Sequence, residues 1–341
     1  MNRKEIVSLI VLILVISWGA WRYFNRSYTE TKTRFLLDTY VEISASSKNK
    51  NVGKDIESVF DYIEKMEAKL DEYDDDSWIS KFNKLSKGTM EMDPDAYEIL
   101  VLADSLYQLT DGKFDVSIKP VFDLWDFGGE QISIEDSTVA GPPDSMEIKH
   151  QLTKVGFNRL RFNNHQITKT DSLQLSFGAI AKGYILDKAK DYMLSIGLTK
   201  GYISCRSSMI LFGSSIPQVI MIQHPRKPNE EIASFRMDNL SLGTSGDYQQ
   251  YFEYQGRMYH HILDSKTGYP VENTYSVTVV HPSAAWADGL STALFLMEPV
   301  KAIELIKTIP QANAVIYYNN NGTTVSLKSK GMQELGLKEN L

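Results

Sequence analysis

The stretch Gly178-Ala-Ile-Ala-Lys-Gly183 places small residues and one lysine at the start of a segment of helical character that reaches about Ile196. Small side chains leave the first backbone amides of a helix uncovered, and these amides together with the helix dipole attract phosphate. Lys182 adds a fixed cation in the same turn. The pattern therefore predicts a phosphate-binding helix start at Gly178 and Lys182, although a plain strand-to-helix turn has the same composition.

On both sides of this stretch, short helices and strands are mixed without a strand–helix–strand rhythm. Apolar residues at helical spacing predict a helix from Ile56 to Leu70, Asp93-Pro94 is a typical helix start, and alternation predicts a strand over 35–44. The other expected elements are strands near 201–205, 209–212, 219–223 and 232–236, helices over 285–297 and 300–308, and a hairpin of 314–318 with 323–327 across Asn321-Gly322. The predicted fold class is α+β, a single domain of mixed helices and antiparallel sheet.

Weaker signals divide the region between Pro94 and Gly178. Gly112 is a plausible helix end, and Asp144 with Glu147 is typical of a capping-box helix start, with Gly156 at its end. Between them, glycines and prolines mark a loop-rich insertion: Gly128, Gly129, Gly141, Pro142 and Pro143.

The bulk composition is that of an ordinary globular protein. The chain has 341 residues, 43% of them hydrophobic, and a formal net charge of −7. No basic block is present, so no nucleic-acid partner is expected. Cys205 is the single cysteine, which excludes an intramolecular disulfide and a thiolate metal cluster.

The N-terminus predicts export. Residues 6–21 carry no charge and are dominated by Ile, Leu and Val, which is near the lower limit of about 17–25 residues for a spanning helix. Aromatic residues can follow at the far interface: Trp18, Trp21, Tyr23 and Phe24. A cleaved signal peptide is the alternative, but no clear A-x-A cleavage site follows. We expect a membrane anchor or signal segment over 1–27, a linker over 28–34, and an extracytoplasmic domain over 35–341, held as a single-pass protein of the cytoplasmic (inner) membrane.

Two further segments carry groups suited to chemistry. Asp288 and Thr292 are four residues apart on a predicted helix, so a carboxylate and a hydroxyl share one face and could hold Mg²⁺; a solvated Asp and a buried Thr would give the same pattern. Near His260-His-Ile-Leu-Asp264, two imidazoles adjoin a carboxylate and could move protons near neutral pH. Strand alternation lets only one of the two histidines face a given site, and a hairpin with surface histidines is the alternative.

Taken in order, these segments resemble the ApbE family, the FAD:protein FMN transferases, from about residue 35 to 330. The motifs that carry the resemblance are Tyr73-Asp-Asp-Asp-Ser77 before Asn83, Gly112-Lys-Phe-Asp115 with Pro120, Trp125 and Phe127, Gly178–Gly183 with Asp187, Thr244-Ser-Gly-Asp-Tyr248, His261-Ile-Leu-Asp264 with Thr267-Gly268, and Ala287-Asp-Gly-Leu-Ser-Thr292. The resemblance implies an ApbE-like (T-fold-like) domain that cleaves FAD, attaches FMN to a threonine of a membrane redox protein, and releases AMP with the help of Mg²⁺.

The resemblance also implies roles for individual residues. Asp288, Thr292 and the Ala179 backbone carbonyl would bind the metal, and His261 would activate the incoming threonine hydroxyl. Contacts to the flavin nucleotide are implied for Asp115, Gly178, Lys182, Thr244, Ser245, Asp247, Asp264 and Thr267.

The chain departs from the family pattern at several positions. Ser207-Ser208-Met209 stands where Gly-Gly followed by Asp or Asn is usual, and side chains there would narrow the space for a flavin. The other departures are Ser176 for Asp, Asp38 for Gly and Ser265 for Pro. Three functions therefore stay open: FMN transfer, hydrolysis of FAD to FMN and AMP, and a non-catalytic, membrane-anchored flavin-binding scaffold.

Overall fold

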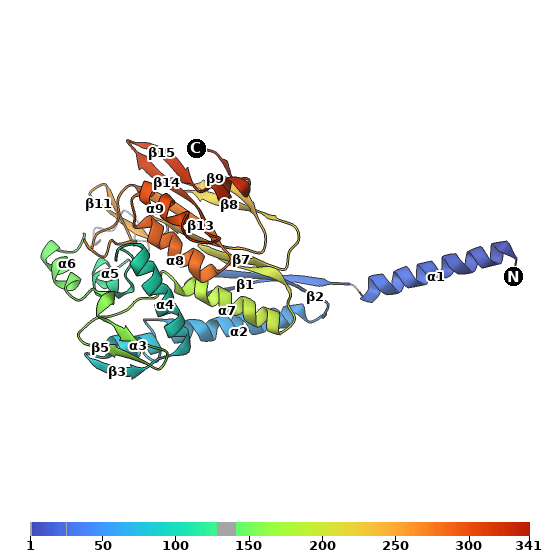
Figure 1. The fold of residues 1–341 in the computed structure, drawn as a ribbon, viewed down its shortest axis with the longest axis horizontal. Helices are drawn as coiled ribbons and strands as arrows, with labels where there is room; N and C mark the ends of the chain where they lie inside the picture. Colours follow the sequence, from blue (N-terminus) through green and yellow to red (C-terminus); the bar gives the residue numbers. More distant parts are fainter. Residues whose placement is uncertain (1, 25, 128–140) are drawn as a thin grey trace.

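The computed structural model describes residues 2–24, 26–127 and 141–341, and its body is one α+β domain from which the N-terminal helix projects (Figure 1). Gly128 and Gly129, at the start of the expected insertion, lie outside the described residues. The fold class and the single apolar N-terminal helix predicted from the sequence are confirmed.

The body is built on an eight-stranded sheet in the order β1-β2-β6-β7-β10-β13-β14-β15, in which every neighbouring pair is antiparallel. Its strands are β1 (Tyr28–Leu36), β2 (Thr39–Ser47), β6 (Lys200–Cys205), β7 (Ser208–Phe212), β10 (Ser241–Gly246), β13 (Thr274–His281), β14 (Asn313–Asn320) and β15 (Thr323–Lys328). The predicted terminal hairpin is confirmed, and Asn321 and Gly322 both have positive φ at its turn.

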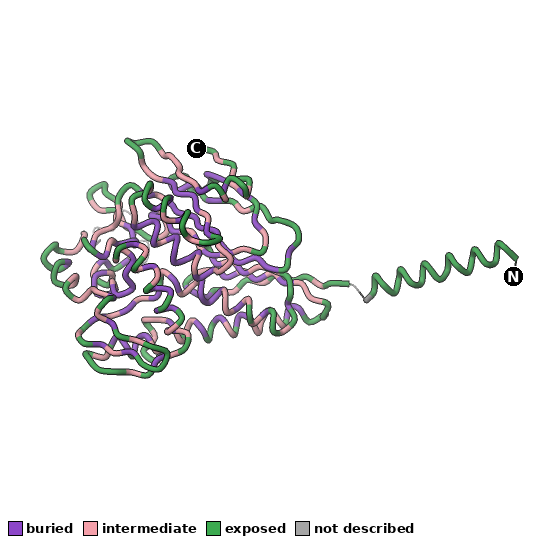
Figure 2. Tube along the Cα trace, viewed as in Figure 1, coloured by how far each residue is buried: buried purple, intermediate pink, exposed green. Residues whose placement is uncertain are grey.

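Helices cover one face of this sheet, and a small second sheet covers part of the other. The helices are α2 (Val52–Leu70), α4 (Pro94–Leu109), α7 (Ala181–Ser195), α8 (Ala284–Phe295) and α9 (Pro299–Ile306); the second sheet has β8 (Gln218–His224), β9 (Lys227–Met237) and β16 (Lys338–Glu339), next to the short helix α10 (Lys330–Glu334). Strand alternation separates the two cores: on β14, Ala314 and Ile316 pack in the helix-side core, whereas Val315 and Tyr317 pack in the other. Figure 2 shows both cores buried beneath an exposed rim.

A third, aromatic cluster joins α5 (Lys119–Trp125) and α6 (Ser145–Leu152) to the hairpin of β11 (Tyr251–Tyr254) and β12 (Arg257–His260). Trp125 lies at its centre and donates from Nε1 to the Gly268 carbonyl at 2.9 Å. Smaller elements complete the domain: α3 (Trp78–Lys84), β3 (Gly88–Glu91), β4 (Arg161–Phe162), β5 (Gln166–Lys169) and the 3₁₀ turns η1 (Val116–Ile118) and η2 (Phe157–Arg159).

Two glycines allow α8 to lie directly against its neighbours. A Cβ on Gly183 of α7 would come within 2.2 Å of the Ala284 carbonyl oxygen, and a Cβ on Gly243 of β10 within 2.5 Å of the Ala287 carbonyl oxygen. Any side chain at either position would push α8 away. This close approach brings Asp288 of α8 against both α7 and the sheet.

The N-terminal part of the body differs from the sequence prediction in two respects. Residues 28–36 form the edge strand β1, paired with β2 along its whole length, so the expected linker over 28–34 is wrong as secondary structure. The single strand expected over 35–44 is interrupted by a tight turn at Leu37 and Asp38, where φ is 55° and 57°. Aspartate tolerates this left-handed backbone better than most residues, which explains how it replaces glycine at position 38.

The N-terminal helix α1 (Arg3–Phe24) is long and apolar enough to cross a membrane, and its 21-residue candidate span is 0% buried within the structure (Figure 2). A signal sequence would meet the same criteria, so α1 is either a signal sequence or an anchor.

Candidate active site

Asp288 lies where α7, α8 and β7 meet, and the residue is only 8% exposed. Its Oδ2 accepts a hydrogen bond from the Gly183 N–H at 2.9 Å, and its Oδ1 accepts one from the Ser208 hydroxyl at 3.0 Å. Burial raises the pKa of this carboxyl, whereas the Gly183 bond and the charge of Lys182 act in the opposite direction. Each carboxylate oxygen has two lone pairs, so both oxygens retain one for a cation.

The start of α8 is fixed by another carboxylate, Asp187 of α7. Its oxygens accept from the Ala284 N–H at 2.9 Å, the Ala285 N–H at 3.0 Å and the Ser283 hydroxyl at 2.6 Å. These N–H groups have no partner within α8, so Asp187 caps the helix from outside. The cap locks α7 to α8 and thereby holds Asp288 in place.

Thr292 lies one turn after Asp288 on α8, as the spacing predicts, and both are joined to β10 by hydroxyl groups. The Ser245 Oγ is 2.9 Å from Thr292 Oγ1 and 2.8 Å from Ser291 Oγ, and Ser291 in turn donates to the Asp288 carbonyl at 2.8 Å. The predicted residue Ser245 therefore orients Thr292, with which it shares a hydrogen bond.

The glycine turn before α7 leaves several backbone groups uncovered. Gly183 is the third residue of α7, so its N–H has no partner within the helix, and it donates to Asp288. Among the described residues nothing donates to the Ala179 carbonyl, and nothing accepts from the N–H groups of Ala179 or Lys182. The Ala179 carbonyl is therefore available to a cation, and the two amides are available to an anion.

His261 follows β12 and is held by the backbone of Gln250. Its Nδ1 is 3.0 Å from the Gln250 carbonyl oxygen, which can only accept, so Nδ1 carries the proton and Nε2 keeps its lone pair. Burial lowers the pKa of His261 to about 4, and the positive charge of Lys182 contributes to that lowering. The ring is therefore a neutral base at neutral pH and lies within the electrostatic reach of Lys182.

The neighbouring His260 has a different role. It is 4% exposed, with Nε2 2.7 Å from the Val271 carbonyl oxygen and Nδ1 accepting from the Ile262 N–H at 3.2 Å. Both ring nitrogens are therefore used in packing the β12 region. As alternation predicts, the two histidines point into different surroundings.

Three of the predicted nucleotide contacts already have structural partners. Asp115 caps η1 by accepting from the Ser117 N–H, the Ser117 hydroxyl and the Phe157 N–H. Asp264 lies 3.2 Å from Lys113 Nζ and accepts from the Lys266 N–H, and Thr267 accepts from the Tyr269 N–H. Asp264 and Thr267 order the loop that follows His261, and Asp115 holds η1 against η2.

Asp247 forms an ion pair that sequence reasoning missed. Its two oxygens accept from Arg226 Nη1 at 2.8 Å and Nη2 at 2.6 Å, and the same guanidinium lies 3.8 Å from the centre of the Tyr275 ring. Burial raises the pKa of Asp247, and the paired Arg226 opposes that rise. Arg226 lies in the β8–β9 turn, and no local signal linked it to position 247.

Thr244 was also predicted to contact the nucleotide. Its Oγ1 lies 3.0 Å from Thr278 Oγ1, which joins β10 to β13.

The side chains at the positions that depart from the family pattern each have a defined contact. Ser208 points to Asp288, whereas Met209 packs against the core on the opposite face of the sheet. Ser176 lies near Glu72, which pairs with Lys119 at 3.2 Å. Ser265 donates to the Gly112 carbonyl at 2.8 Å.

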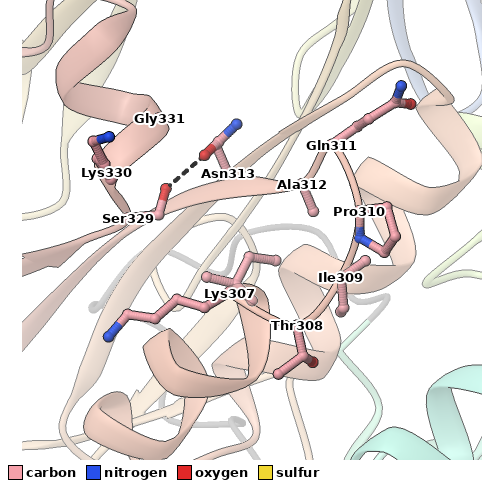
Figure 3. Close-up of a pocket in the computed structure, with 11 residues that line it drawn as sticks. Lys307, Thr308, Ile309, Pro310, Gln311, Ala312, Asn313, Ser329, Lys330 and Gly331 are labelled. Atoms are coloured by element: carbon pink, nitrogen blue, oxygen red, sulfur yellow. Dashed lines mark hydrogen bonds between the residues drawn. The ribbon is translucent and has the colours of Figure 1, made fainter.

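Figure 3 shows a separate hollow of about 500 Å³ between α9 and the start of α10. Its polar wall includes a hydrogen bond of 3.0 Å from the Ser329 hydroxyl to Asn313 Oδ1. None of its lining residues belongs to the Asp288 region. The hollow lies beside the C-terminal helix α10, and its lining contains no residue of the predicted site.

Comparison with known proteins decides the family. The model of the ApbE family matches residues 37–316, and these include every residue of the Asp288 region. The chain belongs to the ApbE family. This chain is similar to the FAD:protein FMN transferase of Haemophilus influenzae, with 29% identity over 94% of this chain and 95% of that relative. It is also similar to the FAD:protein FMN transferase of Vibrio cholerae, with 28% identity over 76% of this chain and 77% of that relative.

Solved structures agree in fold. A crystal structure of an ApbE protein from Thermotoga maritima superposes with a TM-score of 0.81 at 28% identity and covers 90% of this chain and 99% of its own. The apo form of the Pseudomonas stutzeri flavinyl transferase ApbE gives 0.76 at 27% identity, covering 91% and 97%. The α+β architecture is therefore the ApbE fold.

The donor set around Asp288 is suited to a hard divalent cation. It offers a carboxylate, the Thr292 hydroxyl and the uncovered Ala179 carbonyl, all of them oxygen ligands of the kind Mg²⁺ takes. Within the described residues no group of three or more His, Cys, Asp or Glu side chains could hold a metal. A site of this mixed composition fits an ion that completes its shell with water or substrate phosphate.

Proposed function

We propose that this chain transfers FMN from FAD to a threonine hydroxyl of a target redox protein in a Mg²⁺-dependent reaction and releases AMP. The observation that carries the proposal is the hydrogen bond from the Gly183 N–H to Asp288 at the start of α7. It holds the carboxylate next to a turn whose Ala179 carbonyl and whose Ala179 and Lys182 amides have no partner among the described residues. A cation site and an anion site would thus adjoin, as binding of a metal–pyrophosphate requires.

The reaction balances without a further reactant. The threonine oxygen forms a bond to the phosphorus of the FMN half, the pyrophosphate P–O bond to AMP breaks, and the hydroxyl proton leaves. His261 Nε2 receives that proton, because its pKa near 4 keeps the ring neutral and its Nδ1–H is held by Gln250. The low pKa also favours rapid return of the proton to solvent or to the departing phosphate.

The remaining residues bind and orient. Lys182 and the amides of Ala179 and Lys182 would hold the phosphates, and Asp288, Thr292 and the Ala179 carbonyl would hold Mg²⁺. When bound, the metal would neutralise charge on the phosphoryl oxygens. Asp115, Asp264 and Thr267 would act indirectly by ordering the loops beside the site, whereas Gly178, Thr244, Ser245 and Asp247 would border the nucleotide.

The apolar helix α1 supports a location outside the cytoplasm. As an anchor it would hold the catalytic domain at the extracytoplasmic surface of the cytoplasmic membrane, where acceptor subunits of redox complexes would also lie.

The test is incubation of the full chain, in detergent, with FAD, Mg²⁺ and a candidate acceptor domain. AMP is quantified, and the acceptor is scored by in-gel flavin fluorescence. We expect AMP and fluorescent acceptor in equal amounts. AMP without labelled acceptor, after the acceptor threonine is shown to be accessible, would indicate hydrolysis, and neither product from folded protein would refute the transferase and favour a scaffold.

A further inference from the structure

The hydroxyl of Ser208 touches the carboxylate that the proposed function assigns to the metal. We propose that Ser208 is a positioning residue, whose hydrogen bond to Asp288 Oδ1 holds the carboxylate in the orientation that presents its remaining lone pairs to the divalent cation. The inference rests on the proposed metal site but not on the identity of the reaction.

The geometry gives Ser208 a specific effect on Asp288. The carboxylate is held from two sides, by the Gly183 N–H of α7 on Oδ2 and by the Ser208 hydroxyl of β7 on Oδ1. With one donor on each oxygen, rotation about the Cβ–Cγ bond would break both hydrogen bonds. The carboxylate plane is therefore fixed before the metal arrives.

Burial makes the contact strong. Ser208 is 1% exposed and Asp288 is 8% exposed, so water competes little for the hydroxyl or for Oδ1. A hydrogen bond to a charged group in such surroundings is stronger than one between neutral groups. Glycine, the residue of the family pattern at this position, has no side chain to make the bond, so a chain with glycine here lacks this second restraint.

The adjacent Ser207 provides a matched control. Its backbone carbonyl accepts from the Thr244 N–H at 2.8 Å, which fixes the strand register, but its hydroxyl has no hydrogen-bond partner among the described residues. Ser207→Ala and Ser208→Ala remove the same atom one residue apart. Only the second substitution removes the hydrogen bond to Asp288.

The experiment measures Mn²⁺ affinity as a stand-in for Mg²⁺. The full chain in detergent is titrated with Mn²⁺ alone, and free Mn²⁺ is counted from its electron paramagnetic resonance signal. Loss of a partner that orients a ligand typically weakens metal binding 10- to 100-fold. We expect Ser208→Ala to weaken Mn²⁺ binding about tenfold and Ser207→Ala to change it less than about twofold. Circular dichroism confirms that each variant is folded.

The outcomes separate the inference from the reaction. Equal Mn²⁺ affinity in folded wild type and folded Ser208→Ala would overturn it, even if the variant melts at a lower temperature, because a purely structural hydroxyl changes stability and not the affinity of the folded site. Wild type that binds no Mn²⁺ would overturn the metal assignment and the inference together. A tenfold difference in a folded protein that yields neither AMP nor labelled acceptor would refute the transferase and leave the positioning role intact.

Discussion

Two buried aspartates, Asp288 and Asp115, both match motifs of the ApbE family, and the structure uses them in opposite ways. Each is 8% exposed, and burial raises the pKa of both carboxyls. Asp115 accepts three hydrogen bonds from Ser117 and Phe157, all of which build the η1 turn and its contact with η2. Asp288 accepts two, from elements distant in sequence, and keeps a lone pair on each oxygen.

The difference shows that two matched motif residues can have different sets of partners within the fold. Around Asp115, two donors come from Ser117 of η1 and the third comes from Phe157 of η2, so all its partners belong to these two turns. Around Asp288, the donors hold the carboxylate from behind, while Thr292 and the Ala179 carbonyl add oxygen atoms beside it. A matched carboxylate is thus a better ligand candidate where other oxygen donors lie near it.

The largest effect that tests this comparison is expected from Asp288→Asn. The amide keeps the shape and can still accept from Gly183, and the Ser208 hydroxyl can rotate to accept from the new NH₂, so the fold should survive. Loss of the charge should remove Mn²⁺ binding and lower AMP release from FAD by about 1,000-fold or more. A folded variant that turns over at the wild-type rate would exclude Asp288 as the metal ligand.

The matched substitution Asp115→Asn should act on stability instead. Both oxygens of Asp115 accept from backbone N–H groups. In either orientation of the asparagine amide, its NH₂ group would therefore face a backbone N–H and leave that donor without an acceptor. The free energy of unfolding should fall by about 2–3 kcal/mol in urea denaturation, with Mn²⁺ affinity of the folded protein unchanged. A tenfold loss of Mn²⁺ affinity without destabilisation would move Asp115 into the binding site.

The smallest effect concerns the pH dependence caused by His261. Its folded-state pKa of about 4 lies below the unfolded value of 6.5, so between these values only the unfolded chain binds the proton. The free energy of unfolding must therefore fall as the pH decreases from 6.5 towards 4. Between pH 7 and pH 5, the free energy of unfolding of His261→Gln should fall by about 1 kcal/mol less than that of wild type, after allowance for the ring's partial exposure.

The control for this measurement is His165→Gln, at an exposed histidine. Its free energy of unfolding should change with pH as that of wild type does. If His261→Gln also follows wild type, His261 is not held neutral by burial and the assignment of its base form fails. Urea denaturation at the two pH values measures both variants.

Elements with strong local signals could be predicted from the sequence. The apolar spacing of α2, the Asp93-Pro94 start of α4 and the Asn321-Gly322 turn each act within a few residues, and all are found in the structure. The four-residue spacing of Asp288 and Thr292 likewise placed two groups on one helical face. These signals need no knowledge of what the element packs against.

Features that depend on long-range partners could not be predicted. Residues 28–34 alternate threonine with charged side chains, which suited a linker, but their partners are on β2 and α2: Thr31 bonds Ser44, and Arg34 pairs with Glu57 at 2.7 Å. The pairing of Arg226 with Asp247 has no trace in local spacing. The position of Ser208 suggested a narrower flavin space, whereas its hydroxyl is directed at Asp288.

If α1 remains in a bilayer, its short connection to the body would limit the reach of the proposed active site. Only residues 25–27 separate the end of α1 at Phe24 from the first residue of β1, a span of no more than about 14 Å, and β1 is paired with β2 from its first residue. With α1 retained in a bilayer, the domain would stay close to the membrane surface and would meet acceptors by lateral diffusion. For the proposed transfer reaction, acceptors embedded in the same membrane would then be favoured by local concentration, and freely diffusing acceptors would react slowly.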